Sequence, residues 1–127
     1  PDTFARRSWM VPLLPYIDQE AVWRQAVEAA RIRPERFTES PPHPFTTPIP
    51  VYGCPADDRV RAPVLARKSL LVALTSYLGV AGTRNERADG TLFLGRAVRL
   101  AGITDGASQT MIVGERPASP DMWTGWW

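Results

Sequence analysis

Proline is the residue that most restricts what this chain can fold into. The 127 residues include 13 prolines and nine glycines. Each proline fixes φ at about −65° and removes a backbone N–H donor, so long helices are confined to proline-free stretches. Prolines are densest between Pro34 and Pro50. Extended or polyproline backbone and long loops are expected there.

The clearest amphipathic stretch without proline predicts the principal helix, which we expect to begin at Asp18 and to end before Pro34. Asp18 supplies a capping carboxylate, and Glu20 places a negative charge where the helix dipole favours it. Apolar residues recur at positions i, i+3, i+4 and i+7, which puts them on one face. This predicted core face consists of Trp23, Ala26, Val27 and Ala30.

The preceding stretch, residues 8–17, is apolar nearly throughout but contains Pro12 and Pro15. These prolines prevent a regular long helix, whereas Ser8 suits the start of a short one. We therefore predict a buried helical turn or two that carries apolar side chains into the core. The side chains expected to be buried are Trp9, Leu13, Leu14 and Tyr16.

Short strands are expected after the helix. Residues 51–55 predict a strand ending in a turn, the second half of residues 70–81 predicts another, and residues 111–115 predict a third. Asp89-Gly90 is typical of a hairpin turn. The prediction is an α+β fold, with one principal helix packed on a small antiparallel sheet and long proline-rich loops. The length predicts a single globular domain over residues 1–127.

The sequence lacks the residues from which common active sites are built. It has one histidine, His43, and one cysteine, Cys54, and none of the common phosphate-loop or hydrolase motifs. His43 lies among prolines, which favours an exposed loop, and Cys54 is expected to be a small buried residue. Carboxylates such as Asp57, Asp58 and Asp89 leave an acidic pair open, but no enzymatic activity is expected.

The charge distribution argues against nucleic-acid binding, and the hydropathy pattern shows no membrane span within these 127 residues. The 15 basic and 13 acidic residues are interleaved and leave a net charge of +2, whereas nucleic-acid-binding proteins cluster their cations. No apolar run reaches the roughly 18 residues of a membrane span. A single cysteine excludes an intrachain disulfide and leaves the compartment open.

The segment from Thr104 to Thr110 predicts a structural turn. Asp105 is expected to accept hydrogen bonds from amides that follow it, Gly106 to adopt a positive φ, and Ser108 and Thr110 to satisfy further loop amides. The alternative is a calcium site, because Asp105 and Glu115 offer the oxygen ligands that calcium prefers. The same two carboxylates are the pair that a hydrolase would use.

The last residues of the sequence are rich in tryptophan. Exposed aromatic residues mark interaction sites, so Trp123, Trp126 and Trp127 are a candidate surface for a glycan or a protein partner. In the alternative interpretation, these side chains pack back onto the sheet or onto a segment of the protein outside this sequence.

Four segments in the same order, residues 8–19, 54–57, 75–82 and 104–115, together resemble a planctomycete-type family of prepilin-like proteins of unknown function. The opening segment is similar to the family's SWRVLLLPYIEQ element, and the others to its CPSD, TSYLGVAG and TDGTSNTLLVGE elements. Ala107-Ser108-Gln109 departs mildly from the last of these. Weaker likenesses lie at residues 89–93 and 125–127.

The resemblance implies a pilin-like or pseudopilin-like head domain without catalytic residues or cofactors. In such proteins a cleavable prepilin leader and an apolar helix precede the head, and we expect these to precede Pro1 in the full-length protein. The implied setting is the cell envelope or its exterior, in a type IV pilus or a type II secretion fibre. The implied partners are other pilin-like subunits or envelope proteins.

Overall fold

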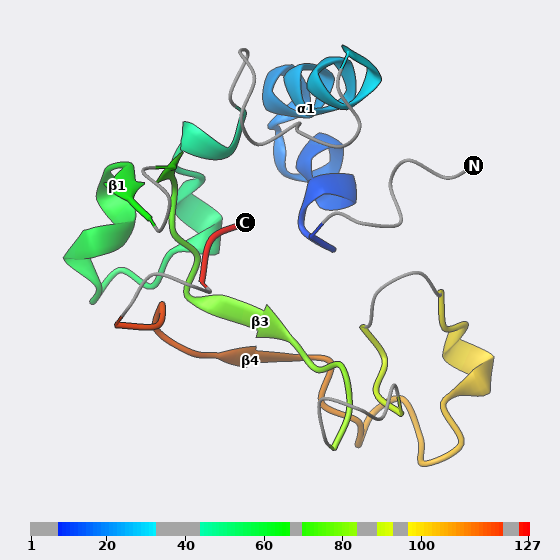
Figure 1. Ribbon diagram of the computed structural model, residues 1–127. Helices are drawn as coiled ribbons and strands as arrows, with labels where there is room; N and C mark the ends of the chain where they lie inside the picture. The colour runs from blue at the N-terminus through cyan, green and yellow to red at the C-terminus, as the bar shows by residue number, and fades with distance from the viewer. Residues whose placement is uncertain (1–7, 33–43, 67–69, 84–88, 93–96, 121–124) are drawn as a thin grey trace.

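The computed structural model describes residues 8–32, 44–66, 70–83, 89–92, 97–120 and 125–127 (Figure 1). These residues form one α-helix, several short 3-10 helices and two separate two-stranded antiparallel sheets. The predicted α+β class is confirmed. His43 and Trp123 lie outside the described residues.

The first element is the 3-10 helix η1, Val11–Ile17. A 3-10 helix has three residues per turn, so Val11, Leu14 and Ile17 align on the face that meets the core. Leu13 and Tyr16, which the sequence predicted to be buried, are 39% and 85% exposed. That prediction was wrong because the segment is a 3-10 helix, whose three-residue period turns Leu13 and Tyr16 away from the face of the buried Val11 and Leu14.

The α-helix α1, Glu20–Ile32, follows after a sharp change of direction. Asp18 has a left-handed conformation with φ 58° and ends η1, so it does not open α1 as predicted. The Gln19 carbonyl accepts a hydrogen bond from the Trp23 amide. The helix thus begins two residues later than the sequence suggested.

The buried face of α1 is rotated slightly from the predicted one. Trp23 and Val27 are only half-buried, whereas two residues outside the predicted stripe are buried. Ion pairs lie on the outer face, between Arg24 and Glu20 and between Arg31 and Glu28. The buried residues of the helix are Val22, Ala26, Ala29 and Ala30.

Short 3-10 turns occupy the next segment, and the first two of them begin with a proline. They are η2, Pro44–Thr46, η3, Pro50–Tyr52, and η4, Asp58–Arg61. The strand predicted at residues 51–55 is absent from this described segment, because Pro50 starts a helical turn and the Gly53 amide bonds back to the Pro50 carbonyl. Asp57 caps η4 by accepting from the Arg59 amide.

The first sheet pairs β1, Val64–Leu65, with β2, Leu71–Val72. Val72 is buried, and its partner Val64 lies against the core on the same face. Leu65 and Leu71 are paired directly and are 66% and 46% exposed, because alternate residues of a strand face opposite sides.

The second sheet pairs β3, Tyr77–Gly79, with β4, Val113–Glu115. Both strands were predicted, and the register places Leu78 opposite Gly114. The pairing brings together the two family-like segments at residues 75–82 and 104–115. Figure 1 shows β4 running along the outer side of β3.

Asp89 and Gly90, predicted to form a hairpin turn, bond to residues just after β3, whereas the flanking residues 84–88 and 93–96 lie outside the described part of the chain. The Asp89 carboxylate accepts hydrogen bonds from the Thr83 amide and hydroxyl at 2.8 and 2.9 Å. These bonds lower the pKa of the Asp89 carboxyl. The Gly90 amide bonds to the Ala81 carbonyl. A Cβ atom at Gly90 would lie 2.5 Å from the Val80 carbonyl oxygen, so only glycine allows this close approach.

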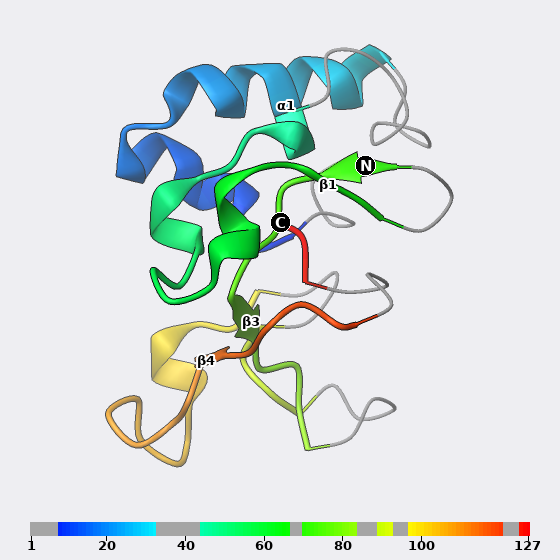
Figure 2. The ribbon, with the colours of Figure 1, turned by 90° about the vertical axis from the view of Figure 1, so that its left-hand side faces the viewer.

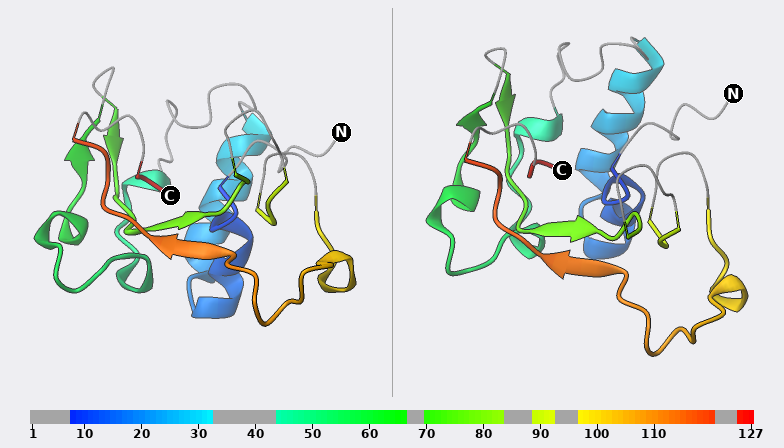
Figure 3. Two further views of the ribbon diagram at one scale, coloured as in Figure 1. Left: turned by 90° about the horizontal axis from the view of Figure 1, so that it is seen from below. Right: turned by 60° about the horizontal axis from the view of Figure 1, so that its bottom comes forward.

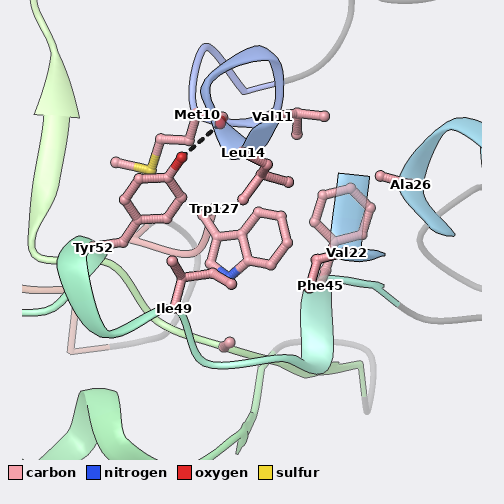
Figure 4. Close-up of a cluster of buried hydrophobic side chains, with 10 residues drawn as sticks. Met10, Val11, Leu14, Val22, Ala26, Phe45, Ile49, Tyr52 and Trp127 are labelled. Carbon is pink, nitrogen blue, oxygen red and sulfur yellow. Dashed lines mark hydrogen bonds between the residues drawn. The ribbon is translucent and has the colours of Figure 1, made fainter. Parts of the chain in front are cut away.

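The principal core cluster lies between η1, α1, η2 and η3 (Figures 2 and 4). The main packing partners of α1 are η1 and η2, rather than a sheet as the sequence suggested. A smaller cluster lies beneath β1 and β2. None of the helices in the described segments is both long and apolar enough to cross a membrane.

Candidate functional site

The family-like motifs converge on a set of buried hydrogen bonds that we call the motif junction, defined by Tyr52, Cys54, Thr75 and Ser76. Thr75 and Ser76 are each 2% exposed. The Thr75 hydroxyl donates to the Tyr52 carbonyl at 3.0 Å, and the Ser76 amide donates to the same carbonyl at 2.8 Å. The loop before Cys54 is thereby fixed to the segment that leads into β3.

Further motifs are attached through the same two residues. The Ser76 hydroxyl accepts from the Cys54 amide at 2.8 Å. The Ser76 carbonyl accepts from the Arg116 amide at 2.7 Å, which anchors the end of β4. The Thr75 amide donates to the Gly125 carbonyl at 2.8 Å. Segments distant in the sequence therefore share one hydrogen-bonded centre.

Tyr52 connects the motif junction to η1. Its side chain is 5% exposed, and its hydroxyl donates to the Met10 carbonyl at 2.7 Å (Figure 4). Burial raises the pKa of the phenol to about 12, because the charged phenolate would lose its hydration. At neutral pH the hydroxyl is therefore a structural donor.

Chemistry at the motif junction is limited by these contacts. The Thr75 and Ser76 hydroxyls bond to backbone groups of Tyr52, Tyr77 and Cys54. A serine or threonine nucleophile needs an adjacent general base, and the hydrogen-bond partners found here are backbone groups. Within the described residues, these hydroxyl groups therefore join backbone segments of the fold.

Trp127 is a core residue and does not belong to an exposed platform. It is 1% exposed, and its ring centroid lies 5.3 Å from that of Phe45 and 6.2 Å from that of Tyr52. Its indole N–H donates to the Thr47 carbonyl at 3.1 Å. Of the two interpretations of the terminal tryptophans, packing back onto the fold applies to Trp127.

Trp126 is half-buried on the other side of the same segment. It forms an antiparallel bridge with Leu74 and packs against the smaller core cluster. Glycine is required at position 125 for two reasons. Its φ is 105°, and an added Cβ would lie 2.4 Å from the Ala118 Cα. The Trp126 side chain is therefore only partly exposed, whereas the predicted binding surface required an exposed ring.

The predicted turn between Thr104 and Thr110 is present, but the amide hydrogen bonds described within it are accepted by backbone carbonyls rather than by the Asp105 carboxylate. Gly106 has φ 90°, as predicted. The Gly106 carbonyl accepts from the Gln109 amide and from the Thr110 hydroxyl, both at 3.0 Å. Asp105 is exposed and contacts the Thr104 hydroxyl at 3.5 Å. The amide bonds predicted for Asp105 are not among those of the described turn. Ser108 is exposed.

The two candidate calcium ligands lie in different elements. Asp105 lies in the turn after η6, Leu100–Gly102, whereas Glu115 ends β4 with an exposed side chain. Within the described part of the chain, no three His, Cys, Asp or Glu residues are close enough to hold a metal ion. Asp105 and Glu115 therefore do not belong to a cluster of three such side chains among the residues that the structure describes.

The acidic pair Asp57-Asp58 is occupied by ion pairs. Asp57 contacts the guanidinium of Arg59 at 2.7 Å, and Asp58 contacts that of Arg61 at 3.0 Å. The hydrogen bonds from Arg59 lower the pKa of the Asp57 carboxyl, which opposes a role as general acid. Cys54 is a free, half-buried thiol.

Thr75 and Ser76 lie in a family-like segment, but the sequence alone predicted no role for either residue. The available signal was two adjacent hydroxyl residues within the apolar run 70–81. Buried hydroxyls require partners, so such a pair predicts a local hydrogen-bonded centre. Its partners come from distant loops, however, and the sequence does not identify them.

Comparison with known proteins identifies a family for this chain. A family model described as "Protein of unknown function (DUF1559)" matches residues 1–126. No curated protein and no solved structure matches the chain.

Proposed function

The chain belongs to the DUF1559 family of proteins of unknown function, and on that premise we propose that it is a non-enzymatic structural head domain. The parent would be a type IV pilin-like or type II secretion pseudopilin-like protein of the cell envelope. Other pilin-like subunits or envelope proteins would be its partners.

The motif junction is the observation that supports this proposal most directly. Tyr52, Thr75 and Ser76 use their polar groups to join separate loops within the fold. In an enzyme, recognisable motifs usually bring reactive side chains to a shared pocket. Here they hold the interior, which suits a subunit whose task is to present a stable surface.

The structure gives less support to a glycan- or protein-binding module built on the terminal tryptophans. Trp127 is buried and Trp126 is half-buried. A stacking platform requires exposed ring faces. The head-domain proposal therefore comes first.

Mass spectrometry of the native amino terminus tests the proposal. The envelope and soluble fractions would be separated, and the N-terminal peptide of the parent protein identified in each. A trimmed, N-methylated terminus in the envelope fraction is expected for a prepilin-like protein. An unprocessed terminus found in the soluble fraction would contradict the proposed role.

A further inference from the structure

The sequence contains the dipeptide Asp-Gly twice, as Asp89-Gly90 and as Asp105-Gly106. Such a dipeptide can react with itself, because the backbone nitrogen of the glycine can attack the side-chain carboxyl of the aspartate. Glycine favours this attack, since it has no Cβ to hinder the approach. The two dipeptides are chemically alike, so the fold around each of them decides whether it can react.

At Asp89-Gly90 the fold holds both reacting groups. The Asp89 carboxylate accepts hydrogen bonds from the Thr83 amide at 2.8 Å and from the Thr83 hydroxyl at 2.9 Å. The Gly90 amide donates to the Ala81 carbonyl at 3.0 Å. Gly90 is also closely packed, because an added Cβ would lie 2.5 Å from the Val80 carbonyl oxygen. The attack requires the backbone to rotate, and these contacts oppose that rotation.

At Asp105-Gly106 the surroundings are open. Asp105 is exposed, and its carboxylate contacts the neighbouring Thr104 hydroxyl at 3.5 Å. An added Cβ at Gly106 would meet no atom of the described residues within 4 Å. The Gly106 amide donates to the Ile103 carbonyl at 3.2 Å, and this single long hydrogen bond must open before the nitrogen can attack. Figure 3 shows the turn between η6 and β4 at the margin of the molecule in both views.

We propose that Asp105 is a site of spontaneous isomerisation to isoaspartate, and that the fold protects Asp89 from the same reaction. The Gly106 nitrogen forms a bond to the Asp105 Cγ, and the carboxyl hydroxyl leaves with the amide proton as one molecule of water. The product is a five-membered succinimide ring. Water then opens this ring at the former backbone carbonyl, so the main chain runs through Cβ and Cγ and a new α-carboxylate forms. This inference does not rest on the proposed function.

Isomerisation would change the backbone of the turn without changing the mass or the formal charge of the chain. It inserts one additional carbon atom into the main chain directly before Gly106, whose carbonyl accepts hydrogen bonds from the Gln109 amide and the Thr110 hydroxyl. Asp105 and Gly106 both lie outside the two core clusters. The modified chain should therefore stay folded and differ from the original at this surface turn.

The test is to age the intact folded chain at about pH 5, where an ordinary aspartate is still partly protonated, and to map its peptides by liquid chromatography and tandem mass spectrometry. An isoaspartyl peptide has an unchanged mass but a different retention time, and the succinimide is lighter by one water. Isoaspartate should accumulate about ten-fold faster at Asp105 than at Asp89, because the hydrogen bonds from Thr83 must break before Asp89 reacts. In concentrated urea the two sites should react at similar rates.

Two variants at exposed positions complete the design, with circular dichroism to show that each stays folded. Thr83→Val removes the hydroxyl that bonds to Asp89, so it should speed isomerisation at Asp89 several-fold and leave the rate at Asp105 unchanged. Asp105→Glu keeps the charge but would need a six-membered ring, so it should remove the reaction at position 105. Asp105 reacting no faster than Asp89 in the folded chain would overturn the proposal. A difference of the same size in urea would overturn it too, because it would not come from the fold.

Discussion

Tyr52 is the residue at which burial and hydrogen bonding are most closely coupled. Its ring contributes to the principal core, and its hydroxyl satisfies a backbone carbonyl of η1. Removing one partner of a buried hydrogen bond leaves the other unsatisfied. Tyr52 is therefore a direct probe of how the motif junction is attached to the beginning of the fold.

Tyr52→Phe should lower the free energy of unfolding by about 1–3 kcal/mol, because the Met10 carbonyl would lose its donor while the ring stays in place. Urea denaturation followed by circular dichroism measures the change. Tyr16→Phe is the matched control, since Tyr16 is 85% exposed. A loss of equal size in both variants would contradict the role assigned to the Tyr52 hydroxyl.

The same phenol predicts a loss of stability at alkaline pH. Burial raises the pKa of Tyr52 from 10.0 to about 12. Because the folded-state pKa is the higher one, this contribution is fully present below about pH 10 and is lost as the pH rises toward 12. Urea midpoints measured across this interval should fall more steeply in the wild type than in Tyr52→Phe. Parallel curves would argue against the raised pKa.

At the scale of single elements, spacing determines which neighbouring residues are buried. In η1, adjacent leucines have opposite environments, since Leu14 is fully buried and Leu13 is 39% exposed. The three-residue period of a 3-10 helix accounts for this difference.

Leu14→Ala should lower the free energy of unfolding by about 2–5 kcal/mol through the cavity it leaves. Leu13→Ala should change it by no more than about 0.5 kcal/mol. Thermal melts of the two variants give the comparison. If the larger loss were found for Leu13, η1 would have to be rotated from the arrangement described.

The turn after η6 offers a second matched pair, of glycines. Gly106 has φ 90°, whereas Gly102 has no positive φ, and neither would bring an added Cβ within 4 Å of another atom. Gly106→Ala should therefore cost about 1–2 kcal/mol from backbone strain alone. Gly102→Ala should be neutral or slightly stabilising in a 3-10 turn. Equilibrium unfolding of both variants would reveal the difference, and equal stabilities would contradict the strained conformation.

Sequence patterns predicted elements whose signals are local. The principal helix, the strands in residues 70–81 and 111–115, and the positive φ of Gly106 each depend on nearby residues. The strand predicted at residues 51–55 failed because Pro50 starts a 3-10 turn. Local sequence patterns could not predict whether Trp127 is buried, because its partners Phe45 and Thr47 lie about eighty positions earlier in the sequence. The motif junction was missed for the same reason.

At the scale of the whole molecule, long-range contacts replace an extensive sheet. Strands of two or three residues contribute few ladder hydrogen bonds. The fold is closed instead by Trp127 and the motif junction, which join the beginning, middle and end of the sequence. Substitutions that remove these contacts should therefore lower the stability of the whole fold.

Trp127→Phe should lower the free energy of unfolding by about 1–3 kcal/mol, because it removes core volume and the hydrogen bond to Thr47. Trp126→Phe should cost less, since Trp126 is half-buried. Chemical denaturation of both variants measures the order of the two losses. A larger loss for Trp126 would contradict the assignment of Trp127 to the core.

The bonded indole of Trp127 also provides a natural reporter of global opening. Its N–H is held by the Thr47 carbonyl, and the ring is almost fully buried. A proton held in this way exchanges with solvent deuterium mainly when the surrounding structure unfolds. In a proton NMR spectrum, the decay of this single indole resonance in deuterated buffer should measure the unfolding free energy under native conditions, without denaturant.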